Sequence, residues 1–390
     1  MEFKFENNEL TVFISGRVDS SNADAVGKEL FSIRENNPGG SLVIDVDGLE
    51  YISSAGLRVI LKLRKTESDL RIVNVNSDIY ETFDMTGFTE MMTIEKAYRR
   101  LSVDGCEAIG QGANGKVYRL DPDTIIKVYY NPDCLPDIQR ERDLARRAFV
   151  LGIPTAIPYD VVRVGDSYGS VFELLDSQTL AQLIAAEPEN LDKYIDMYVD
   201  LLKKIHSTLV KPGDMPDMRE VVIGWAKFVG EYLPEDKAKK LLSLVEAVPV
   251  DYHMMHGDYH VKNVMLQNGE ALLIDMDTLC HGHPVFELAS AFNAYIGFSE
   301  LDNSISLSFL GLPHETTVEI WNKALPLYLE TDDKKRVAEV EKKAMLIGYT
   351  RLMRRLIRRK GLETPEGRNE IEFYKKRICE LLDEVDTLTF

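Results

Sequence analysis

A polar loop followed by a strand that ends in carboxylates constrains the fold of this 390-residue chain more than any other feature. The loop reads HGDYHVKN over residues 256–263, and the next apolar stretch reads LLIDMD over residues 272–277. Asp258 and Asn263 share the loop, and Asp275 ends the apolar strand. Carboxylate and amide oxygens are ligands that Mg²⁺ accepts in proteins. The pattern therefore predicts a fold that brings the loop and the strand end together around a metal ion.

A glycine-rich segment precedes this loop in the sequence. Residues 109–118 read IGQGANGKVY, and Gly110, Gly112 and Gly115 form a GxGxxG pattern. Glycines at the tip of a hairpin let backbone N–H groups approach phosphate oxygens, and Lys127 on the following strand can reach the same phosphates. A dinucleotide-binding loop is the alternative, but it should open a helix. Here a strand continues through Val117, which favours a kinase-type phosphate-binding hairpin.

A charge-rich helix is predicted over residues 136–150. Glu141 within it is the acid that we expect to pair with Lys127 and hold the lysine in place. The alternative is that Glu141 is a solvated glutamate on a helix with many charges.

Residues 168–175 read as a buried strand that runs into a hinge. Phe172 would lie behind an adenine pocket, and the backbone from Glu173 to Leu175 would offer hydrogen bonds to the base. An ordinary core strand describes the same residues equally well.

Together these motifs resemble a known family. HGDxHxxN followed by a strand-borne IDxD is similar to the aminoglycoside phosphotransferase and choline kinase group, and it differs from the HRD and DFG motifs of ordinary protein kinases. The resemblance covers about residues 105–390 and is loosest at 181–250 and after 300. It implies an α+β bilobal protein kinase-like domain over 104–390, with a β-rich N-lobe at about 104–178 and a helical C-lobe at about 179–390.

The resemblance also implies roles for the motif residues. Asp258 would be the catalytic base, and Asn263 and Asp275 would bind Mg²⁺. Lys127 and Glu141 would form an ion pair beside bound ATP.

Three further positions are interpreted through the same resemblance. Asp277 would support the metal site, and His256 would be a hydrogen-bonded structural residue. Glu287 lies where the family usually has aspartate, and its longer side chain is expected to change how this position holds the catalytic loop.

The first hundred residues follow a different pattern, in which short strands alternate with amphipathic helices. Strands are predicted near 10–15, 41–46, 70–75 and 93–98, and helices over 22–36, from Ser53 or Ser54 onward, and over 78–85. This pattern predicts an α/β domain with a mixed sheet. GRVD at 16–19, DVDGL at 45–49 and YISSAGL at 51–57 resemble the STAS domain of anti-sigma-factor antagonists over roughly residues 1–102. We therefore place a STAS-like regulatory domain at 1–103.

The STAS resemblance directs attention to a helix start. In that family a hydroxyl there accepts phosphate from a partner kinase, and a helix N-terminus stabilises a phosphate. In this chain Ala55 occupies the usual acceptor position, so Ser53 and Ser54 are the candidates for phosphorylation. The alternative is that these serines only cap the helix.

Composition and charge limit the classes of partner. The formal net charge is −18, which argues against nucleic acid as a partner. No apolar run is long enough to cross a bilayer, and the N-terminus lacks the apolar core of a signal peptide. The four cysteines are dispersed and include no CxxC pair, which suits reduced thiols in a cytoplasmic protein.

Histidines near the polar loop raise a zinc alternative. His253, His256 and His260 have the spacing of ligands on a helix, but Gly257 makes the segment a loop, in which this spacing has no special meaning. The sequence therefore does not predict a zinc site.

Arginines recur at helical spacing from Arg351 to Arg359. This basic face could bind an anionic substrate, the STAS domain or a membrane surface. The alternative is a solvated face balanced by nearby acids.

The sequence thus predicts an ATP- and Mg²⁺-dependent phosphotransferase that moves the γ-phosphate to a hydroxyl of a small polar molecule and is coupled to a STAS domain. One alternative is a protein serine kinase, a partner-switching regulator that acts on STAS-domain serines and binds an anti-sigma-type or STAS partner. Another is a nucleotide-binding pseudokinase, which the presence of base, lysine and metal ligands disfavours.

Overall fold

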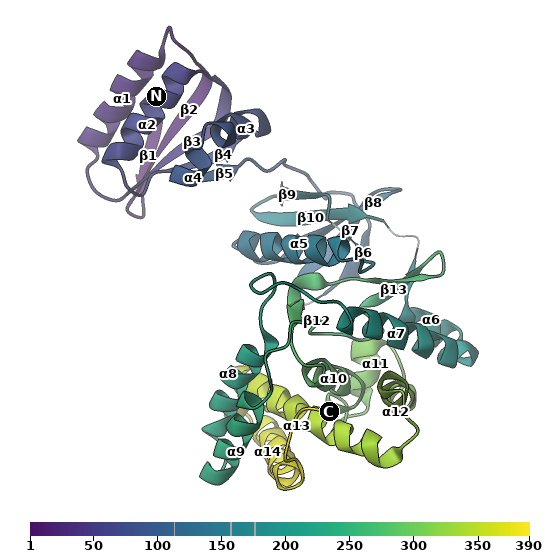
Figure 1. Ribbon diagram of the computed structural model, residues 1–390. Coiled ribbons are helices and arrows are strands. Elements are labelled where there is room, and N and C mark those ends of the chain that lie inside the picture. Colours follow the sequence, from purple (N-terminus) through teal and green to yellow (C-terminus); the bar gives the residue numbers. More distant parts are fainter. Residues whose placement is uncertain (113, 157, 175–176) are drawn as a thin grey trace. The chain divides into compact units, whose positions relative to one another are not determined.

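The computed structural model describes residues 1–112, 114–156, 158–174 and 177–390. The chain divides into two compact units, each with its own cluster of buried apolar side chains. Unit 1 comprises Met1–Asp104 and Val161–Gly169, and unit 2 comprises Gly105–Asp160 and Ser170–Phe390. Each unit is described separately (Figure 1).

Unit 1 is built on a five-stranded sheet in the order β1-β2-β3-β4-β5. β1 is antiparallel to β2, whereas the other neighbouring strands are parallel. The predicted mixed sheet is therefore correct, but the edge strand β1 was not anticipated, although its sequence EFKFE alternates charged and aromatic residues as a strand does. The strands are β1 (Glu2–Glu6), β2 (Glu9–Val18), β3 (Ser41–Ile52), β4 (Arg71–Val75) and β5 (Thr93–Lys96).

Helices lie between these strands along the chain. Helices α1 and α2 lie side by side (Figure 1), close enough that a Cβ on Gly27 would be 3.2 Å from the Val59 side chain. The helices are α1 (Ala23–Asn36), α2 (Ser54–Thr66), α3 (Ser77–Met85) and α4 (Phe88–Met91).

The start of α2 is fixed by a serine cap and a close approach. The Ser53 hydroxyl accepts hydrogen bonds from the backbone N–H groups of Ala55 and Gly56, which satisfies donors that a helix start leaves free. A Cβ on Gly56 would lie 2.7 Å from Ile52 Cγ1 and 2.9 Å from Val18 Cγ1. Glycine is therefore the residue that lets α2 begin directly against the sheet.

Unit 2 begins with strands and continues with helices. Its first sheet has the order β6-β7-β8-β10-β9, in which β6, β7 and β8 are successive antiparallel neighbours. Within this sheet, the stretch Val161–Gly169 of β9 and β10 is the part of the chain that is grouped with unit 1. Helix α5 (Leu135–Val150) follows β8. The strands are β6 (Ala108–Gln111), β7 (Gly115–Asp121), β8 (Thr124–Tyr129), β9 (Asp160–Val164) and β10 (Ser167–Glu173).

Two small sheets lie within the helical part of unit 2 and present the polar loop. Their orders are β11-β13-β14 and β12-β15. Their strands are β11 (Gln178–Thr179), β12 (Met254–Met255), β13 (Val264–Gln267), β14 (Glu270–Leu273) and β15 (Cys280–His281). Asp275 was expected to end the strand, but β14 ends at Leu273, and Asp275 follows in the left-handed backbone region with a φ of 63°.

The remaining elements are helical. The long helix α13 packs against α8, α10 and α14, and all four helices contribute side chains to the apolar core of unit 2. The α-helices are α6 (Leu180–Ala186), α7 (Leu191–His206), α8 (Met218–Gly230), α9 (Glu235–Glu246), α10 (Val285–Phe292), α11 (Ser304–Leu310), α12 (His314–Leu329), α13 (Lys334–Arg358) and α14 (Pro365–Glu384). The short helical turns are η1 (Pro188–Asn190), η2 (Met276–Thr278), η3 (Asn293–Gly297) and η4 (Gly361–Glu363).

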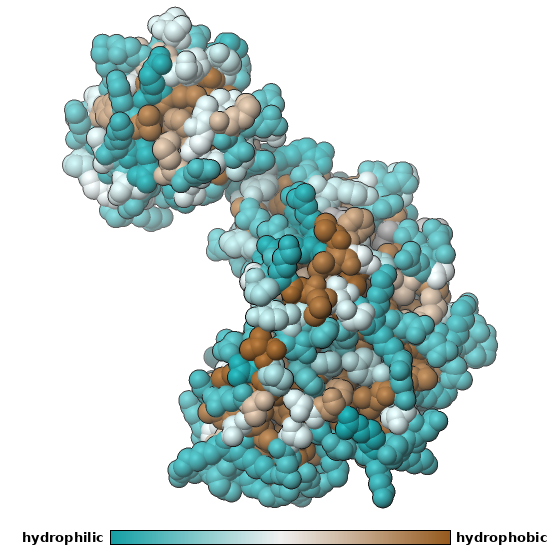
Figure 2. All heavy atoms as spheres, in the orientation of Figure 1, coloured by the Kyte–Doolittle hydropathy of each residue, from teal (hydrophilic) through white to brown (hydrophobic). Residues whose placement is uncertain are grey.

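Hydrophilic side chains cover most of the visible surface of each unit (Figure 2). Among the described residues, no helix is both long enough and apolar enough to cross a membrane.

We expect Gly56→Ala to lower the free energy of unfolding of unit 1 by about 1–3 kcal/mol, because the new methyl group overpacks the contact between α2 and the sheet. Ile52 and Val18 are β-branched and rotate away poorly. Urea denaturation measures the effect. Gly224→Ala is the matched control, because Gly224 is exposed within α8 and its Cβ would meet open space. An unchanged denaturation midpoint for Gly56→Ala would contradict this account of the glycine.

Candidate active site

Strand register lines up the glycine-rich hairpin with the lysine. Gly110 on β6 is paired with Val117 on β7, and Val117 is paired in turn with Lys127 on β8. Directly opposite residues on neighbouring strands place their side chains on the same face of a sheet. The three predicted positions therefore share one face.

The glycines of this hairpin meet different demands. A Cβ on Gly115 would lie 2.4 Å from the Val128 carbonyl oxygen, so the strand pairing itself requires glycine there. A Cβ on Gly112 would meet open space, and one on Gly110 would make only ordinary contact with Val117. Packing among the described residues thus does not explain Gly110 and Gly112.

Lys127 is held by carboxylates from two directions. Its Nζ lies 3.4 Å from Glu141 Oε1 on α5 and 3.2 Å from Asp275 Oδ1. The other oxygen of Glu141 accepts a hydrogen bond from the Tyr129 hydroxyl at 2.8 Å. Burial opposes the charged form of Lys127, but Glu141 and Asp275 raise the pKa of the lysine above its usual value. Lys127 is therefore a fixed cation at this site.

The polar loop is anchored by Glu287 on α10. Its carboxylate, 1% exposed as a residue, accepts hydrogen bonds from the backbone N–H groups of His256, Gly257 and Tyr259. Burial alone would raise the pKa of Glu287, but His206, His256 and the Gly257 N–H hold it below its usual value. Glu287, which stands where the family usually has aspartate, therefore reaches the loop and binds its backbone.

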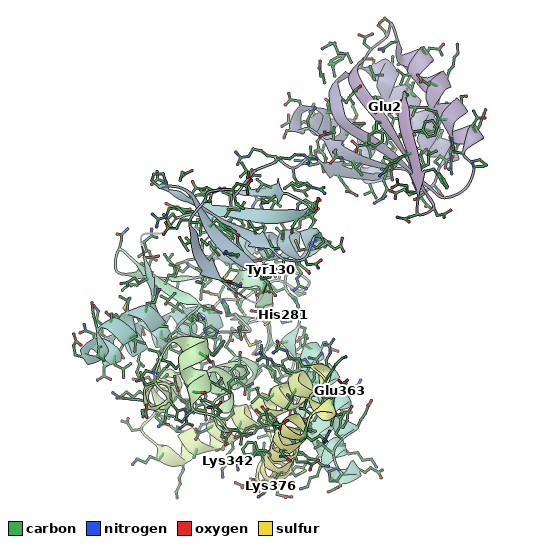
Figure 3. All side chains as sticks on the ribbon, turned by 180° about the vertical axis from the view of Figure 1, so that it is seen from behind. Glu2, Tyr130, His281, Lys342, Glu363 and Lys376 are labelled. Carbon is green, nitrogen blue, oxygen red and sulfur yellow. The ribbon has the colours of Figure 1, made fainter. Side chains whose placement is uncertain are left out.

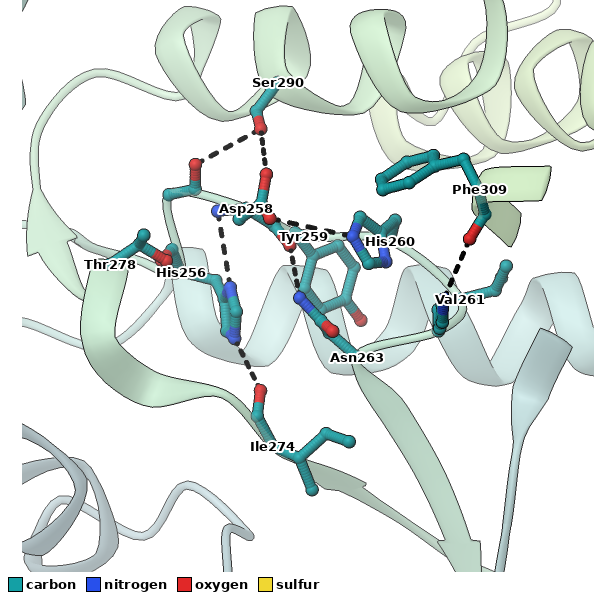
Figure 4. Close-up of polar contacts among 12 residues, drawn as sticks. His256, Asp258, Tyr259, His260, Val261, Asn263, Ile274, Thr278, Ser290 and Phe309 are labelled. Atoms are coloured by element: carbon teal, nitrogen blue, oxygen red, sulfur yellow. Dashed lines mark hydrogen bonds and ion pairs between the residues drawn. The ribbon is translucent and has the colours of Figure 1, made fainter. Parts of the chain in front are cut away.

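Asp258 lies at the centre of a set of donors (Figure 4). His260 Nε2 lies 3.7 Å from its Oδ2, and the Ser290 hydroxyl lies 3.5 Å from its Oδ1. Arg351 Nη2 also lies 3.5 Å from Oδ1. Burial opposes ionisation, but His260, Arg351 and His256 hold the pKa of Asp258 well below its usual range. The carboxylate is therefore ionised at neutral pH.

His256 is fully buried and makes hydrogen bonds at both ring nitrogens (Figure 4). Nε2 lies 3.1 Å from the Ile274 carbonyl oxygen, which can only accept, so Nε2 has the proton. Nδ1 then accepts from the backbone N–H of Asp258 at 3.3 Å. The two contacts tie the loop to the residue that directly follows β14.

Asn263 and Asp275 have the chemistry of a magnesium site. Asn263 Nδ2 donates to the Asp258 carbonyl oxygen at 3.0 Å, which leaves the amide oxygen of Asn263 as an available ligand. The Ile274 N–H donates to the Asn263 carbonyl oxygen at 3.1 Å and so holds Asp275 next to the loop. An amide oxygen and a carboxylate fit Mg²⁺, which accepts few protein ligands and keeps several waters.

Asp277 lies on η2, just beyond Asp275. Burial, together with the carboxylates of Asp275 and Glu141, raises the pKa of Asp277 to about 7. Its backbone carbonyl oxygen accepts a hydrogen bond from Arg140 Nη2 on α5 at 3.3 Å.

Of the residues predicted to surround the adenine base, Phe172 and Glu173 lie within the described part of the chain. Phe172 is half-buried near the end of β10, and Glu173, the last residue of that strand, is exposed. Leu175 lies outside the described residues. Between them, the Leu174 N–H donates to the Asp123 carbonyl oxygen at 2.7 Å, so this N–H is already used.

Several contacts of the site were missed by sequence reasoning. Arg351 was grouped with the basic face, yet its Nη1 donates to the Ser290 hydroxyl at 2.7 Å and to the Gly257 carbonyl oxygen at 3.3 Å. Nothing in helical spacing reveals which residue faces the loop. Tyr129 could have been found, because it lies two residues after Lys127 on the same strand face.

The histidines near the loop are divided among separate partners. His253 Nδ1 contacts Asp251, whereas His260 contacts Asp258. Within residues that the structure describes, no group of three or more histidine, cysteine or acidic side chains could hold a metal ion.

In unit 1 the two candidate serines differ in environment. Ser53 is half-buried and its hydroxyl caps α2, whereas Ser54 is exposed at the first position of that helix.

Comparison with known proteins agrees with this geometry. Residues 105–311 match the phosphotransferase enzyme family, which is more than half of the chain. The chain belongs to this family. Residues 1–101 match the STAS domain, so the phosphotransferase follows an N-terminal STAS domain. The STAS and phosphotransferase resemblances seen in the sequence are thereby confirmed.

Individual relatives match each part. Over 89 residues the chain is 32% identical to the putative anti-sigma factor antagonist BtrV of Bordetella bronchiseptica, a match that covers 22% of this chain and 76% of the relative. The aminoglycoside phosphotransferase APH(4)-Ia is similar with a TM-score of 0.49 and 13% identity, over 71% of this chain and 93% of that one. A choline/ethanolamine kinase family protein from Mesorhizobium loti gives a TM-score of 0.45 and 17% identity, over 72% and 88%.

We expect Glu287→Gln to lower the free energy of unfolding of unit 2 at pH 7. At least one loop N–H then loses its acceptor, which costs about 1–3 kcal/mol for each buried donor left unsatisfied. Urea denaturation of both proteins measures the difference. Glu287→Asp is the control that keeps the charge, and equal stability of wild type and Glu287→Gln would contradict the anchoring role.

The same pair of proteins has a predicted pH dependence. The pKa of Glu287 is lower when folded than its usual value near 4.5. Stabilisation by the ionised carboxylate is therefore complete above about pH 4.5 and is lost as the pH falls through the folded-state pKa. The stability difference between wild type and Glu287→Gln should shrink over that range.

Proposed function

We propose that this phosphotransferase moves the γ-phosphate of Mg-ATP to a hydroxyl group of a small acceptor, with Asp258 as the base. The observation that carries the proposal is the position of Lys127 between Glu141 and Asp275. One cation thereby joins the glycine-rich hairpin to the carboxylate beside the polar loop. Phosphoryl transfer needs this convergence of phosphate-binding, metal-binding and base residues.

On the nucleotide side, Lys127 would bind phosphate oxygens while Glu141 keeps its ammonium group in place. Packing among the described residues does not require glycine at positions 110 and 112. The absence of side chains at these two positions would let phosphates come close to the backbone of the hairpin. When bound, Mg²⁺ would neutralise charge that develops on the phosphate oxygens, and Asn263 and Asp275 would hold it.

On the acceptor side, Asp258 would orient the hydroxyl and receive its proton. The hydroxyl oxygen forms a bond to the γ-phosphorus while the bond from that phosphorus to the bridging oxygen breaks, and ADP leaves. The low pKa of Asp258 keeps the carboxylate ionised and able to accept the hydrogen bond. Arg351 and His260 hold its two oxygens in position.

We expect Asp258→Asn to lower kcat by about 10²–10⁴-fold, the range associated with loss of a positioned acid or base. ADP production with a panel of hydroxyl compounds measures turnover, and titration with Mg-AMP-PNP measures nucleotide binding. Binding should be retained, because Asp258 lies on the acceptor side.

Asp302→Asn is the matched control, since Asp302 is an exposed aspartate whose carboxylate accepts hydrogen bonds from the backbone N–H and the hydroxyl of nearby Ser304. Equal turnover by wild type and Asp258→Asn would exclude Asp258 as the base. Failure of the wild type to bind Mg-AMP-PNP would overturn the ATP-dependent function and leave a non-catalytic module.

A second candidate is a protein serine kinase that acts on a STAS-domain serine, with the STAS domain serving in partner switching. Exposure of Ser54 at the start of α2 favours it, because backbone N–H groups and the helix dipole at that position stabilise a phosphate.

For this second candidate, incubation with Mg-ATP should add one phosphoryl group to the intact mass of the wild type. We expect Ser54→Ala to abolish the gain and Ser53→Ala to retain it, because the Ser53 hydroxyl is occupied as a cap. Asp258→Asn is the negative control. An unchanged wild-type mass would exclude self-phosphorylation.

A further inference from the structure

The C-terminal half of α13 has an unusual concentration of positive charge, which we call the arginine face: Arg351, Arg354, Arg355, Arg358 and Arg359. These positions recur at intervals of three or four residues, so they follow one side of the helix. In Figure 3, Lys342 lies in the preceding half of α13, and Glu363 lies shortly after the helix ends.

Ion pairing differs between the two halves of α13. In the first half, Arg336 and Lys343 both pair with Glu339, and Lys342 pairs with Glu384. In the second half, Arg351 contacts Asp258. The other arginines of the face have no carboxylate oxygen within 4.0 Å among the described parts of the chain. These residues are Arg354, Arg355, Arg358 and Arg359.

This lack of partners is unexpected in a chain with a net charge of −18. Burial first, and then the neighbouring arginines, lower the pKa of both Arg354 and Arg355, although Asp258 acts to raise the pKa of Arg355. The helix dipole favours cations in the last turn, by about 0.3–1 kcal/mol each. That effect explains Arg355 and Arg358 but not the arginines one turn earlier. Of the predicted alternative, a solvated face balanced by nearby acids, the direct ion pairs are therefore missing for these four arginines among the described residues, although Arg355, Arg358 and Arg359 are exposed.

Aromatic rings hold the first arginines in place. The guanidinium carbons of Arg351 and Arg354 lie 5.7 and 5.9 Å from the centre of the Trp225 ring on α8. That of Arg355 lies 4.9 Å from the centre of the Phe298 ring. Stacking on a ring orients a guanidinium and leaves its edge free for two parallel hydrogen bonds to a phosphate or carboxylate.

We propose that the arginine face is the anion-binding part of the acceptor site, so that the acceptor is a small hydroxyl compound with a phosphate or carboxylate group. This inference rests on the proposed function, because Arg351 connects the face to Asp258. Each helical turn advances about 5.4 Å. The anionic group would bind one to two turns from Arg351, roughly 5–11 Å along the helix.

The position of the face favours a small soluble acceptor over an anionic membrane surface. Arg355, Arg358 and Arg359 are exposed, whereas Arg351 and Arg354 are half-buried, and Arg351 directly contacts the loop that holds Asp258. Exposed basic residues alone would also suit a membrane surface, but binding to a membrane would not need the contact with this loop. A cationic acceptor would meet like charge on this face, so the geometry disfavours one.

Inorganic phosphate is the first probe, used at constant ionic strength with the nucleotide site filled by Mg-AMP-PNP. Trp225 reports locally through its fluorescence, and the chain's other tryptophan, Trp321, is buried and donates to Glu341. Broadening of the ³¹P resonance of phosphate is the independent readout. We expect saturable binding that weakens at least about tenfold in Arg354→Gln/Arg358→Gln, as expected when two charged hydrogen-bond donors are lost.

Arg336→Gln is the matched control, because it removes one positive charge near the other end of α13 and should leave phosphate binding unchanged. Circular dichroism confirms that each variant is folded. Absence of saturable binding in both readouts, or equal binding by all variants, would overturn the proposal.

Acceptor pairs then test the consequence for turnover. Glycerol 3-phosphate should either stimulate ADP production as an acceptor or inhibit it by competing with another acceptor. Its half-maximal effect should occur at a concentration at least about tenfold below that of glycerol, since glycerol lacks the charged hydrogen-bond acceptor. Arginine-dependent binding to phosphatidylglycerol vesicles without binding of phosphate would instead establish a membrane surface. Turnover of neutral compounds without phosphate binding would refute this inference and leave the proposed function intact. Failure to bind Mg-AMP-PNP would refute the proposed function, and with it the acceptor role that rests on it.

Discussion

The carboxylate of Glu287 is the interaction on which the site depends. It accepts hydrogen bonds from three backbone N–H groups of the polar loop, which contains both Asp258 and Asn263. A buried carboxylate is costly unless its hydrogen bonds are satisfied, and the loop N–H groups would be equally costly without an acceptor. Each therefore requires the other, which fixes the path of the loop before any ligand binds.

Lys127 links this loop region to the strands before it. Its contact with Asp275 joins β8 to the residues that follow β14, and its contact with Glu141 joins β8 to α5. The two carboxylates stabilise the charged form of the ammonium group of Lys127. A phosphate entering the site would change that balance, since it adds negative charge that Mg²⁺ and the lysine would share.

Much of this arrangement was predictable from the sequence because the signals were local. Alternation of strands and helices gave the α/β unit, and the spacing within HGDYHVKN placed Asp258 and Asn263 on one loop. The exposed edge strand β1 was missed, although the alternation of charged and aromatic residues in EFKFE is a local strand signal. Contacts made across long sequence separations were also missed. Arg351 on α13 contacts Ser290 and Gly257, which lie 61 and 94 residues away in the sequence. Helical periodicity does not indicate which neighbour a helix face will contact.

The arginine face shows how structure adds to a family assignment. Sequence gave the spacing of the arginines but left open whether acids balance them. The structure shows direct ion pairs along one part of the helix: Arg336, Lys342 and Lys343 in the first half of α13 have carboxylate partners. The arginines beyond Arg351 have none within 4.0 Å among the described residues. An acidic chain has many carboxylates with which to neutralise such a cluster. Under the proposed function, uncompensated charge beside the ionised Asp258 would suit a ligand that supplies the missing negative charge. Function depends on the site and not on the fold alone, so the charge of this helix face, and not the nucleotide-binding residues, would then determine which acceptor is used.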